Sequence, residues 1–158
     1  MPADSAAIEI EAAPEAVFDL LHDYSQRLEW DPFLREARLL DGALHAALGV
    51  TTRCVARRRA GGLAMDTVYV SFARPSVAAV KMTQGPRLFH SFAASIRQAR
   101  VGSSKTRVLY RYNFELRPPW LAPLLTPFVR WAFHRQTRRR LEALKRFLER
   151  QSVVEMTN

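Results

Sequence analysis

The sequence predicts an α+β fold in which a curved antiparallel sheet of about seven strands wraps around a long C-terminal helix, with two short helices after the first strand. Three observations support this prediction. Apolar and polar residues alternate with a period of two through most of residues 35–117. Breaks rich in Gly and Pro separate the alternating runs, so successive strands should form an antiparallel meander. After Pro118 and Pro119 the period changes to that of a helix.

A strand and two short helices are expected first. Residues 6–12 alternate Ile with Glu, which is typical of a half-buried strand. Pro14 then favours the start of a helix whose apolar residues lie on one face. A second short helix within residues 27–34 should end at Asp31, because the residue before a proline is pushed out of helical dihedrals.

Six further strands are expected where the period of two continues. They cover residues 35–42, 49–59, 64–73, 76–84, 88–100 and 105–117. The breaks between them hold the turn residues Gly42, Gly49, Gly61, Gly62, Pro75, Gly85, Pro86 and Gly102.

A long amphipathic helix is expected from Pro127 to near Gln151, with Thr126 as its cap. Its apolar stripe comprises Val129, Phe133, Thr137, Leu144, Phe147 and Leu148. Gln136 and Arg140 fall near the middle of that stripe, which a helix serving only for packing would not choose. Because the stripe must cover apolar surface, the helix and the concave face of the sheet should enclose a space of the kind that holds ligands.

Length and composition limit the class of protein. The 158 residues fit one domain, 1–158, and the content of 48% hydrophobic and 25% charged residues is that of a globular chain. The start lacks a basic leader followed by an apolar run, and no segment approaches ~20 apolar residues, so a soluble cytoplasmic protein is expected. The lone Cys54 excludes an intramolecular disulfide and is expected as a buried, inert thiol on a strand.

The net charge of +9 is unevenly placed along the chain. Residues 1–41 hold 3 basic and 10 acidic side chains, whereas the remainder holds 21 basic and 5 acidic ones. An acidic N-terminal part can neutralise some of the basic body and leave one face positive. Nucleic acid is not an expected partner, because helix-turn-helix, zinc-finger and RNA-recognition motifs are missing.

Three stretches of sequence carry a resemblance to a known family: residues 8–34, 106–117 and 138–149. They resemble the START-like helix-grip superfamily (SRPBCC), specifically its polyketide cyclase/dehydrase and lipid-transport branch, over nearly the whole chain in element order. The resemblance implies a helix-grip fold with a hydrophobic cavity between the sheet and the long helix, usually without a metal or nucleotide. The Gly-rich loop of plant pollen-allergen members is reduced here to residues 60–62. No cyclase active-site pattern matches residue by residue, so no catalytic residue is carried over.

Three functions are compatible with this fold. The leading hypothesis is a carrier or sensor of a small lipophilic molecule of polyketide, lipid, isoprenoid or aromatic type. In the second, an enzyme of cyclase or dehydratase type uses the same cavity, mainly by positioning its substrate. In the third, the basic C-terminal helix docks on a partner protein or a membrane. No cofactor is expected, since P-loop and dinucleotide motifs are missing and the histidines and Cys54 form no pair at metal-ligand spacing.

The predicted cavity residues come from several elements. They are Trp30, His90, Phe92, Tyr110, Tyr112, Phe114, Val129, Phe133 and Arg140. Alternation places Tyr110 and Tyr112 inward, where their hydroxyls either bond to backbone in the core or meet a ligand oxygen. His90 shares the more apolar phase of its strand and is either structural or a proton-transfer group. Arg140 either binds a ligand carboxylate or phosphate, or reaches solvent along its apolar stem.

Two smaller features complete the predictions. Glu29 and Asp31, on either side of Trp30, are expected as surface charges or capping groups beside a helix end. Trp30 and Phe33 should pin the short helix at the rim of the sheet, where Trp30 can also touch ligand. On the outer side of the C-terminal segment an aromatic and basic group either packs on a neighbouring element or docks on an anionic membrane or a protein. This group comprises Leu124, Phe128, Trp131, Arg130, Arg135 and Arg138.

Overall fold

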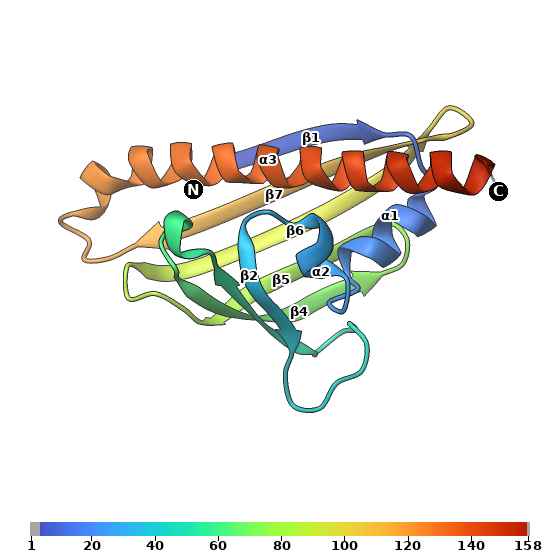
Figure 1. Cartoon of the computed structure of the whole chain (residues 1–158). Coiled ribbons are helices and arrows are strands. Elements are labelled where there is room, and N and C mark those ends of the chain that lie inside the picture. The colour runs from blue at the N-terminus through green and yellow to red at the C-terminus, as the bar shows by residue number, and fades with distance from the viewer. Residues whose placement is uncertain (1–3, 158) are drawn as a thin grey trace.

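A computed structural model, which describes residues 4–157, has a seven-stranded antiparallel sheet curved around one long helix (Figure 1). The predicted helix-grip fold is thereby confirmed. The elements are β1 (Asp4–Ile10), α1 (Pro14–Leu21), α2 (Arg27–Trp30), β2 (Leu34–Leu39), β3 (Thr51–Ala56), the 3-10 turn η1 (Arg58–Ala60), β4 (Ala64–Ala73), β5 (Val77–Gln84), β6 (Phe89–Val101), β7 (Lys105–Leu116) and α3 (Ala122–Thr157).

The sheet has the strand order β1-β7-β6-β5-β4-β3-β2. Strands β2 to β7 therefore form a meander, and the last strand, β7, pairs with the first, β1. All neighbouring strands are antiparallel, as the short links between alternating runs predicted. The register shifts between Phe89 and Ser91 in β6, and between Tyr69 and Ser71 in β4. Each shift changes which side chains face the concave side of the sheet.

The main core lies where the second half of α3 crosses β1 and α1. Leu141, Leu144 and Leu148 of α3 are buried in one cluster with Ile10 and Trp30. Their spacing of three and four residues puts them on one helix face. Trp30 thus anchors α2 in this buried core beside α3, whereas it was predicted to pin the short helix at the rim of the sheet.

A second cluster fills the space between the sheet and the first half of α3. Phe92, Tyr112 and Phe114 are buried there, and Phe133 of α3 packs among them with ring centroids 4.8 Å from Tyr112 and 5.2 Å from Phe92. Phe89 joins the same cluster, with its ring centroid 5.7 Å from that of Phe114. At this end of the molecule the sheet and the helix are joined by aromatic packing.

The long helix begins earlier than predicted, at Ala122, and continues to Thr157. The chain already turns before it, because the amides of Leu121 and Ala122 both donate to the carbonyl of Pro118. Thr126 is therefore inside the helix, and its hydroxyl donates to the Ala122 carbonyl at 2.7 Å. The prediction that Thr126 caps the helix was wrong. No helix within residues 4–157 has a stretch long and apolar enough to span a membrane.

Candidate functional site

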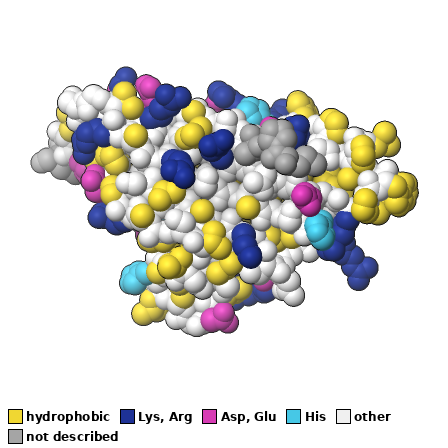
Figure 2. Space-filling model, turned by 180° about the vertical axis from the view of Figure 1, so that it is seen from behind, with side chains coloured by type: hydrophobic (Ala, Val, Ile, Leu, Met, Phe, Trp, Pro, Cys, Tyr) yellow, Lys and Arg dark blue, Asp and Glu magenta, His cyan; other side chains and the backbone are white. Residues whose placement is uncertain are grey.

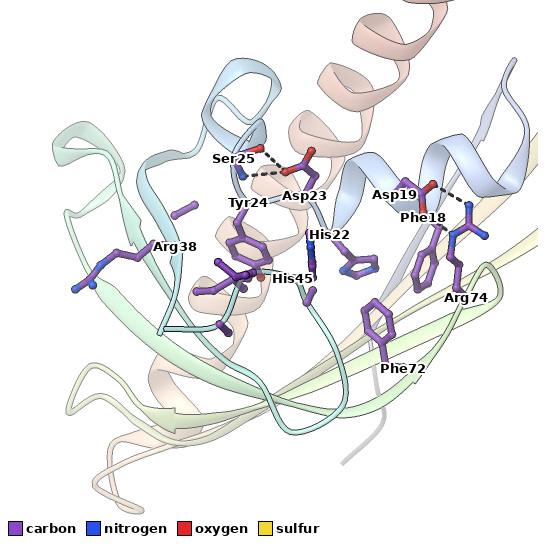
Figure 3. A pocket seen from close by; sticks show the side chains of 15 residues that line it. Phe18, Asp19, His22, Asp23, Tyr24, Ser25, Arg38, His45, Phe72 and Arg74 are labelled. Carbon is purple, nitrogen blue, oxygen red and sulfur yellow. Dashed lines mark hydrogen bonds and ion pairs between the residues drawn. The ribbon is translucent and has the colours of Figure 1, made fainter. Parts of the chain in front are cut away.

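A cleft of about 690 Å³ lies beside α1, between the α1–α2 turn, β2 and the loop that joins β2 to β3 (Figure 3). Its lining residues are Phe18, Asp19, His22, Asp23, Tyr24, Ser25, Ala37, Arg38, Leu39, Ala43, Leu44, His45, Ala46, Phe72 and Arg74. This volume suits a small organic ligand, since such sites commonly measure roughly 300–1,000 Å³.

One wall of the cleft is aromatic. Phe18 of α1 meets Phe72 of β4 edge to face, with ring centroids 5.1 Å apart. The ring of His22, just after α1, packs 4.5 Å from Phe18 and 5.4 Å from Phe72. The apolar spacing of α1 puts Phe18 and His22 on the same side of the chain, one turn apart. An apolar ligand body would therefore lie against a rigid surface of rings.

Three neutral polar groups stand behind this wall. His22 Nδ1 lies 2.8 Å from the hydroxyl of Tyr69, and the hydroxyl of Tyr24 lies 3.4 Å from the same oxygen. Tyr69 is buried, whereas His22 and Tyr24 are half-buried and line the cleft. His22 Nε2 is buried and has no hydrogen-bond partner among residues 4–157. The site therefore has hydrogen-bonding capacity that the protein itself does not use.

Burial keeps these groups uncharged. The pKa of His22 is lowered to about 3, mainly by burial and also by the nearby positive charge of Arg27, while Asp19 opposes the shift. Burial also raises the pKa of Tyr24 and of Tyr69, so both remain phenols at neutral pH. The site can donate and accept hydrogen bonds, but it carries no charge at its inner wall.

Hydrogen bonds hold two carboxylates at the mouth of the cleft. Arg74 donates through Nε and Nη2 to the two carboxylate oxygens of Asp19, at 2.7 and 2.8 Å. Asp23 accepts hydrogen bonds from the Ser25 hydroxyl at 2.5 Å, from Gln26 Nε2 at 2.8 Å and from the Ser25 amide at 3.0 Å. These bonds lower the pKa of Asp19 and of Asp23, so both carboxylates stay ionised.

Asp31 is buried between two arginines, whereas a surface charge was predicted for it. Its Oδ2 accepts from Arg27 Nε at 3.0 Å and from Arg140 Nε at 3.0 Å, and Arg140 Nη2 lies 2.9 Å away. Its Oδ1 accepts from the amide of Phe33 at 3.0 Å, in the turn that follows α2 and not at a group of the helix itself. Burial alone would raise the pKa of Asp31, but Arg140 and Arg27 lower it. Glu29 is exposed, as expected.

Arg140 thus forms an ion pair with a carboxylate of the protein itself. Its guanidinium also lies over the ring of Phe33, at 5.2 Å from the centroid. The role as an anchor for a ligand carboxylate or phosphate stays a prediction, because Arg140 keeps donors that Asp31 does not occupy. Cys54 lies on β3 as predicted and is half-buried, and burial raises the pKa of its thiol.

The prediction that His90 faces the cavity was wrong, because its side chain is exposed. The register shift between Phe89 and Ser91 is the cause. It places Phe89 and Phe92 on the concave face and turns His90 to the other side. Strict alternation, which the prediction assumed, fails at such a bulge.

The other predicted site residues lie away from the cleft. Phe92, Tyr112, Phe114, Val129 and Phe133 belong to the aromatic cluster beneath α3, with Tyr110 half-buried at its edge. Trp30 lies in the core formed with α3. None of them lines the cleft, and contact of these residues with a ligand stays a prediction.

Sequence reasoning missed the residues that do form the cleft. His22 and Tyr24 come from the α1–α2 turn and Phe72 comes from β4, and the β2–β3 loop that covers them has no periodic pattern. A structural irregularity in β4 explains why Phe72 was missed. The register shift between Tyr69 and Ser71 brings both Tyr69 and Phe72 to the concave side, which alternation alone separates.

A family model described as polyketide cyclase / dehydrase and lipid transport matches residues 2–149, nearly the whole chain. The chain belongs to this polyketide cyclase/dehydrase and lipid transport family. The resemblance read from the sequence is therefore confirmed. No curated protein matches the chain in sequence.

Solved structures share the fold of this family member. The Zhui aromatase/cyclase from a Streptomyces species superimposes with a TM-score of 0.81 at 14% identity, covering 96% of this chain and 95% of that one. A protein of Thermus thermophilus gives a TM-score of 0.79 at 18% identity, covering 96% and 99%. A START superfamily protein from Mycobacterium smegmatis gives 0.77 at 15% identity, covering 94% and 98%. At these identities the likeness establishes the fold alone.

Within residues 4–157, His, Cys, Asp and Glu side chains form no group of three that could hold a metal ion. The inner wall of the cleft presents aromatic surface and neutral hydrogen-bonding groups. These two elements recognise shape, apolar area and single oxygen atoms.

Proposed function

We propose that the protein binds a small lipophilic molecule in the cleft beside α1, as a carrier or sensor. The observation that carries the proposal is the combination of about 690 Å³ of space with an aromatic wall and three neutral polar groups behind it. The family supports the same class of function, since its description names lipid transport.

The proposed ligand has an apolar body and at least one oxygen. The body would pack on Phe18 and Phe72, and the oxygen would bond to Tyr24 or to the unpartnered Nε2 of His22. An unpaired buried donor or acceptor costs roughly 1–3 kcal/mol, and a ligand atom that satisfies it recovers this energy. Polyketides, isoprenoid quinones and oxygenated aromatic compounds have this composition.

A cyclase or dehydratase activity has less support at this cleft. A general acid or base works best with a pKa near the working pH. The pKa of His22 is about 3, and burial raises the pKa of Tyr24 and Tyr69, so none of the three changes its proton near neutral pH. The name of the Streptomyces structure describes an aromatase/cyclase, and turnover of a bound polyketide would favour that activity here.

Blocking the cleft tests the proposal. Ala46 lines the cleft, and Ala47 in the same loop is exposed and does not line it. We expect Ala46→Trp to weaken binding of a neutral fluorescent apolar probe such as N-phenyl-1-naphthylamine by at least about tenfold, through occupied volume. Ala47→Trp should leave binding unchanged, since it adds the same side chain outside the cleft.

Native mass spectrometry then identifies the class of ligand. Protein purified from its own host should carry an added mass that Ala46→Trp loses and Ala47→Trp keeps. Equal probe affinity and equal added mass in both variants would show that the ligand binds elsewhere.

A further inference from the structure

Four large apolar side chains are exposed together where α3 begins. They are Trp120, Leu124, Phe128 and Trp131, with exposed fractions of 80%, 78%, 67% and 57%, and we call them the outer patch. The last three follow at intervals of four and three residues, so they share one face of the helix. Figure 2 shows hydrophobic side chains gathered at the right-hand end of the molecule, the end at which α3 begins.

This face points away from the one that packs on the sheet. Leu141, Leu144 and Leu148 are buried on the inner side of α3, and at 100° per residue the three helical members of the outer patch point about 130° away from them. Phe128 and Trp131 contact each other, with ring centroids 6.3 Å apart. The outer patch therefore contributes nothing to the core, although large exposed aromatic residues are unfavourable in water.

The surroundings of the outer patch are strongly basic. No Asp or Glu occurs between Glu115 and Glu142, while six arginines do. Arg130 pairs with Asp4, and Arg140 pairs with Asp31. The remaining four are Arg117, Arg135, Arg138 and Arg139, and none of them has a carboxylate within ion-pair distance among residues 4–157.

Two of these four arginines lie farther along the helix face that carries the outer patch. Arg135 and Arg138 follow Trp131 at intervals of four and three residues, and the Arg135 guanidinium lies over the Trp131 ring at 5.6 Å. At 1.5 Å rise per residue, about 10 Å separates Leu124 from Trp131 along the axis, and about 10 Å more separates Trp131 from Arg138. On this face the apolar side chains therefore lie nearer the start of the helix, and the cations lie after them.

We propose that the outer patch docks the protein on an anionic phospholipid membrane. An interfacial helix buries its apolar side chains about 5–10 Å into the boundary between headgroups and acyl chains, while its cations bind lipid phosphates. Leu124, Phe128 and Trp131 would supply the buried apolar side chains, and Arg135 and Arg138, farther along the same face, would bind the phosphates. Docking of a second copy through the same face would bring two strongly basic surfaces together, which is unfavourable.

Arg117 extends the basic rim beyond the helix. Its Nε donates to the carbonyl of Arg87 at 2.6 Å, so the exposed chain segments of both residues meet at the same end of the sheet. The cations consequently come from the sheet as well as from α3. Docking would bring this end of the molecule to the membrane surface, and it does not depend on whether the cleft holds a ligand.

Vesicle co-sedimentation of the full chain tests the docking. We expect binding to vesicles that contain about one third phosphatidylglycerol, little binding to pure phosphatidylcholine, and release at about 0.5 M salt. The double variant Leu124→Gln with Phe128→Gln should lower the partition coefficient at least about tenfold. Its matched control, Val153→Gln with Val154→Gln, removes two exposed apolar residues at the other end of the same helix and should bind as the wild type does.

A charge series separates insertion from attraction. Arg135→Gln and Arg138→Gln should each weaken binding to the anionic vesicles about fivefold, since one cation near such a surface contributes about 1 kcal/mol. Arg146→Gln, farther along the helix and paired with Glu142, should have less effect. Probe binding in the cleft should be unchanged in all these variants, which distinguishes failure of docking from failure of the ligand proposal.

Two outcomes would overturn the docking proposal. The first is equal binding to anionic and neutral vesicles, or no binding to either. The second is a concentration-dependent dimer that the Leu124 and Phe128 double variant abolishes without any loss of vesicle binding, which would assign the outer patch to a second copy.

Discussion

Arg140 of α3 and Asp31 at the end of α2 meet across 109 positions of sequence, with Arg140 Nε and Nη2 lying 3.0 and 2.9 Å from one carboxylate oxygen. Arg27 donates to the same oxygen from within α2. One carboxylate therefore faces two guanidinium groups in a largely buried site. This contact joins the short helix to the long one at the point where Trp30 packs between them.

Asp31→Asn should lower the free energy of unfolding by about 3 kcal/mol. Loss of the carboxylate leaves two poorly hydrated arginines without their shared counter-charge, and breaking one partner of a buried pair typically costs about 3–5 kcal/mol. Urea unfolding followed by tryptophan fluorescence measures the change. Glu29→Gln, an exposed carboxylate in the same short helix, is the control and should shift stability by less than about 0.5 kcal/mol.

The pH dependence of stability should contain a contribution from His22. Its pKa is about 3 in the folded protein against 6.5 for an exposed histidine. The unfolded chain therefore takes up a proton that the folded chain excludes, so stability is lost as the pH falls from about 6.5 towards 3. The largest change in the free energy of unfolding that this one group can cause is roughly 1.4 kcal/mol per pH unit.

His22→Phe should remove this contribution. The measurement is urea unfolding of wild type and variant at several pH values between about 7 and 4, and the informative quantity is the difference between the two curves. His45→Gln removes an exposed imidazole of the same cleft and should reproduce the wild-type curve. Parallel curves for wild type and His22→Phe would contradict the assignment.

Tyr24→Phe should weaken binding of an oxygen-bearing ligand about fivefold, which corresponds to one neutral hydrogen bond. The ring and its packing in the cleft remain, so a purely apolar ligand should bind as before. Tyr112→Phe makes the same change in the aromatic cluster, outside the cleft, and serves as the control. Loss of affinity only in Tyr112→Phe would place the ligand beneath α3 instead, as the alternation of β7 predicted.

Phe133→Ala should destabilise the protein by about 3 kcal/mol, because it opens a cavity among Phe92, Tyr112 and Phe114. Trp131→Ala removes a larger side chain two positions earlier on the exposed face of the same helix. Its effect on the free energy of unfolding should stay below about 1 kcal/mol. Thermal denaturation of both variants compares the inner and outer faces of α3 directly.

The fold was largely predictable from the sequence because its determinants are local. Alternation defined the strands, and Asp31 before Pro32 ended α2 where expected, with extended dihedrals at Asp31. The site was less predictable. The bulge beside His90 reverses the alternation of inward and outward side chains in β6, and the residue types of this strand do not predict it.

Long-range contacts escaped sequence reasoning for a related reason. The pair of Asp31 and Arg140 depends on the position of α2 relative to α3, which no spacing in either segment encodes. The cleft is formed by a turn and a loop, where residue patterns carry little information about position. Periodicity predicts which face of an element is buried, but not where two elements leave space between them.

The loop between β2 and β3 has a consequence for how ligand choice can change. It is tied to the sheet at its base, where the Gly49 amide donates to the Tyr69 carbonyl and the Tyr69 amide donates to the Val50 carbonyl, both within 3.0 Å. Beyond this base, Leu44 and Leu48 are mostly exposed and support no core. Ala46 packs against the cluster of Phe18 and Tyr69, but the residues on either side of it contribute little to the core. Under the proposed function, new specificities would arise by exchanging these neighbours while the framework keeps its stability.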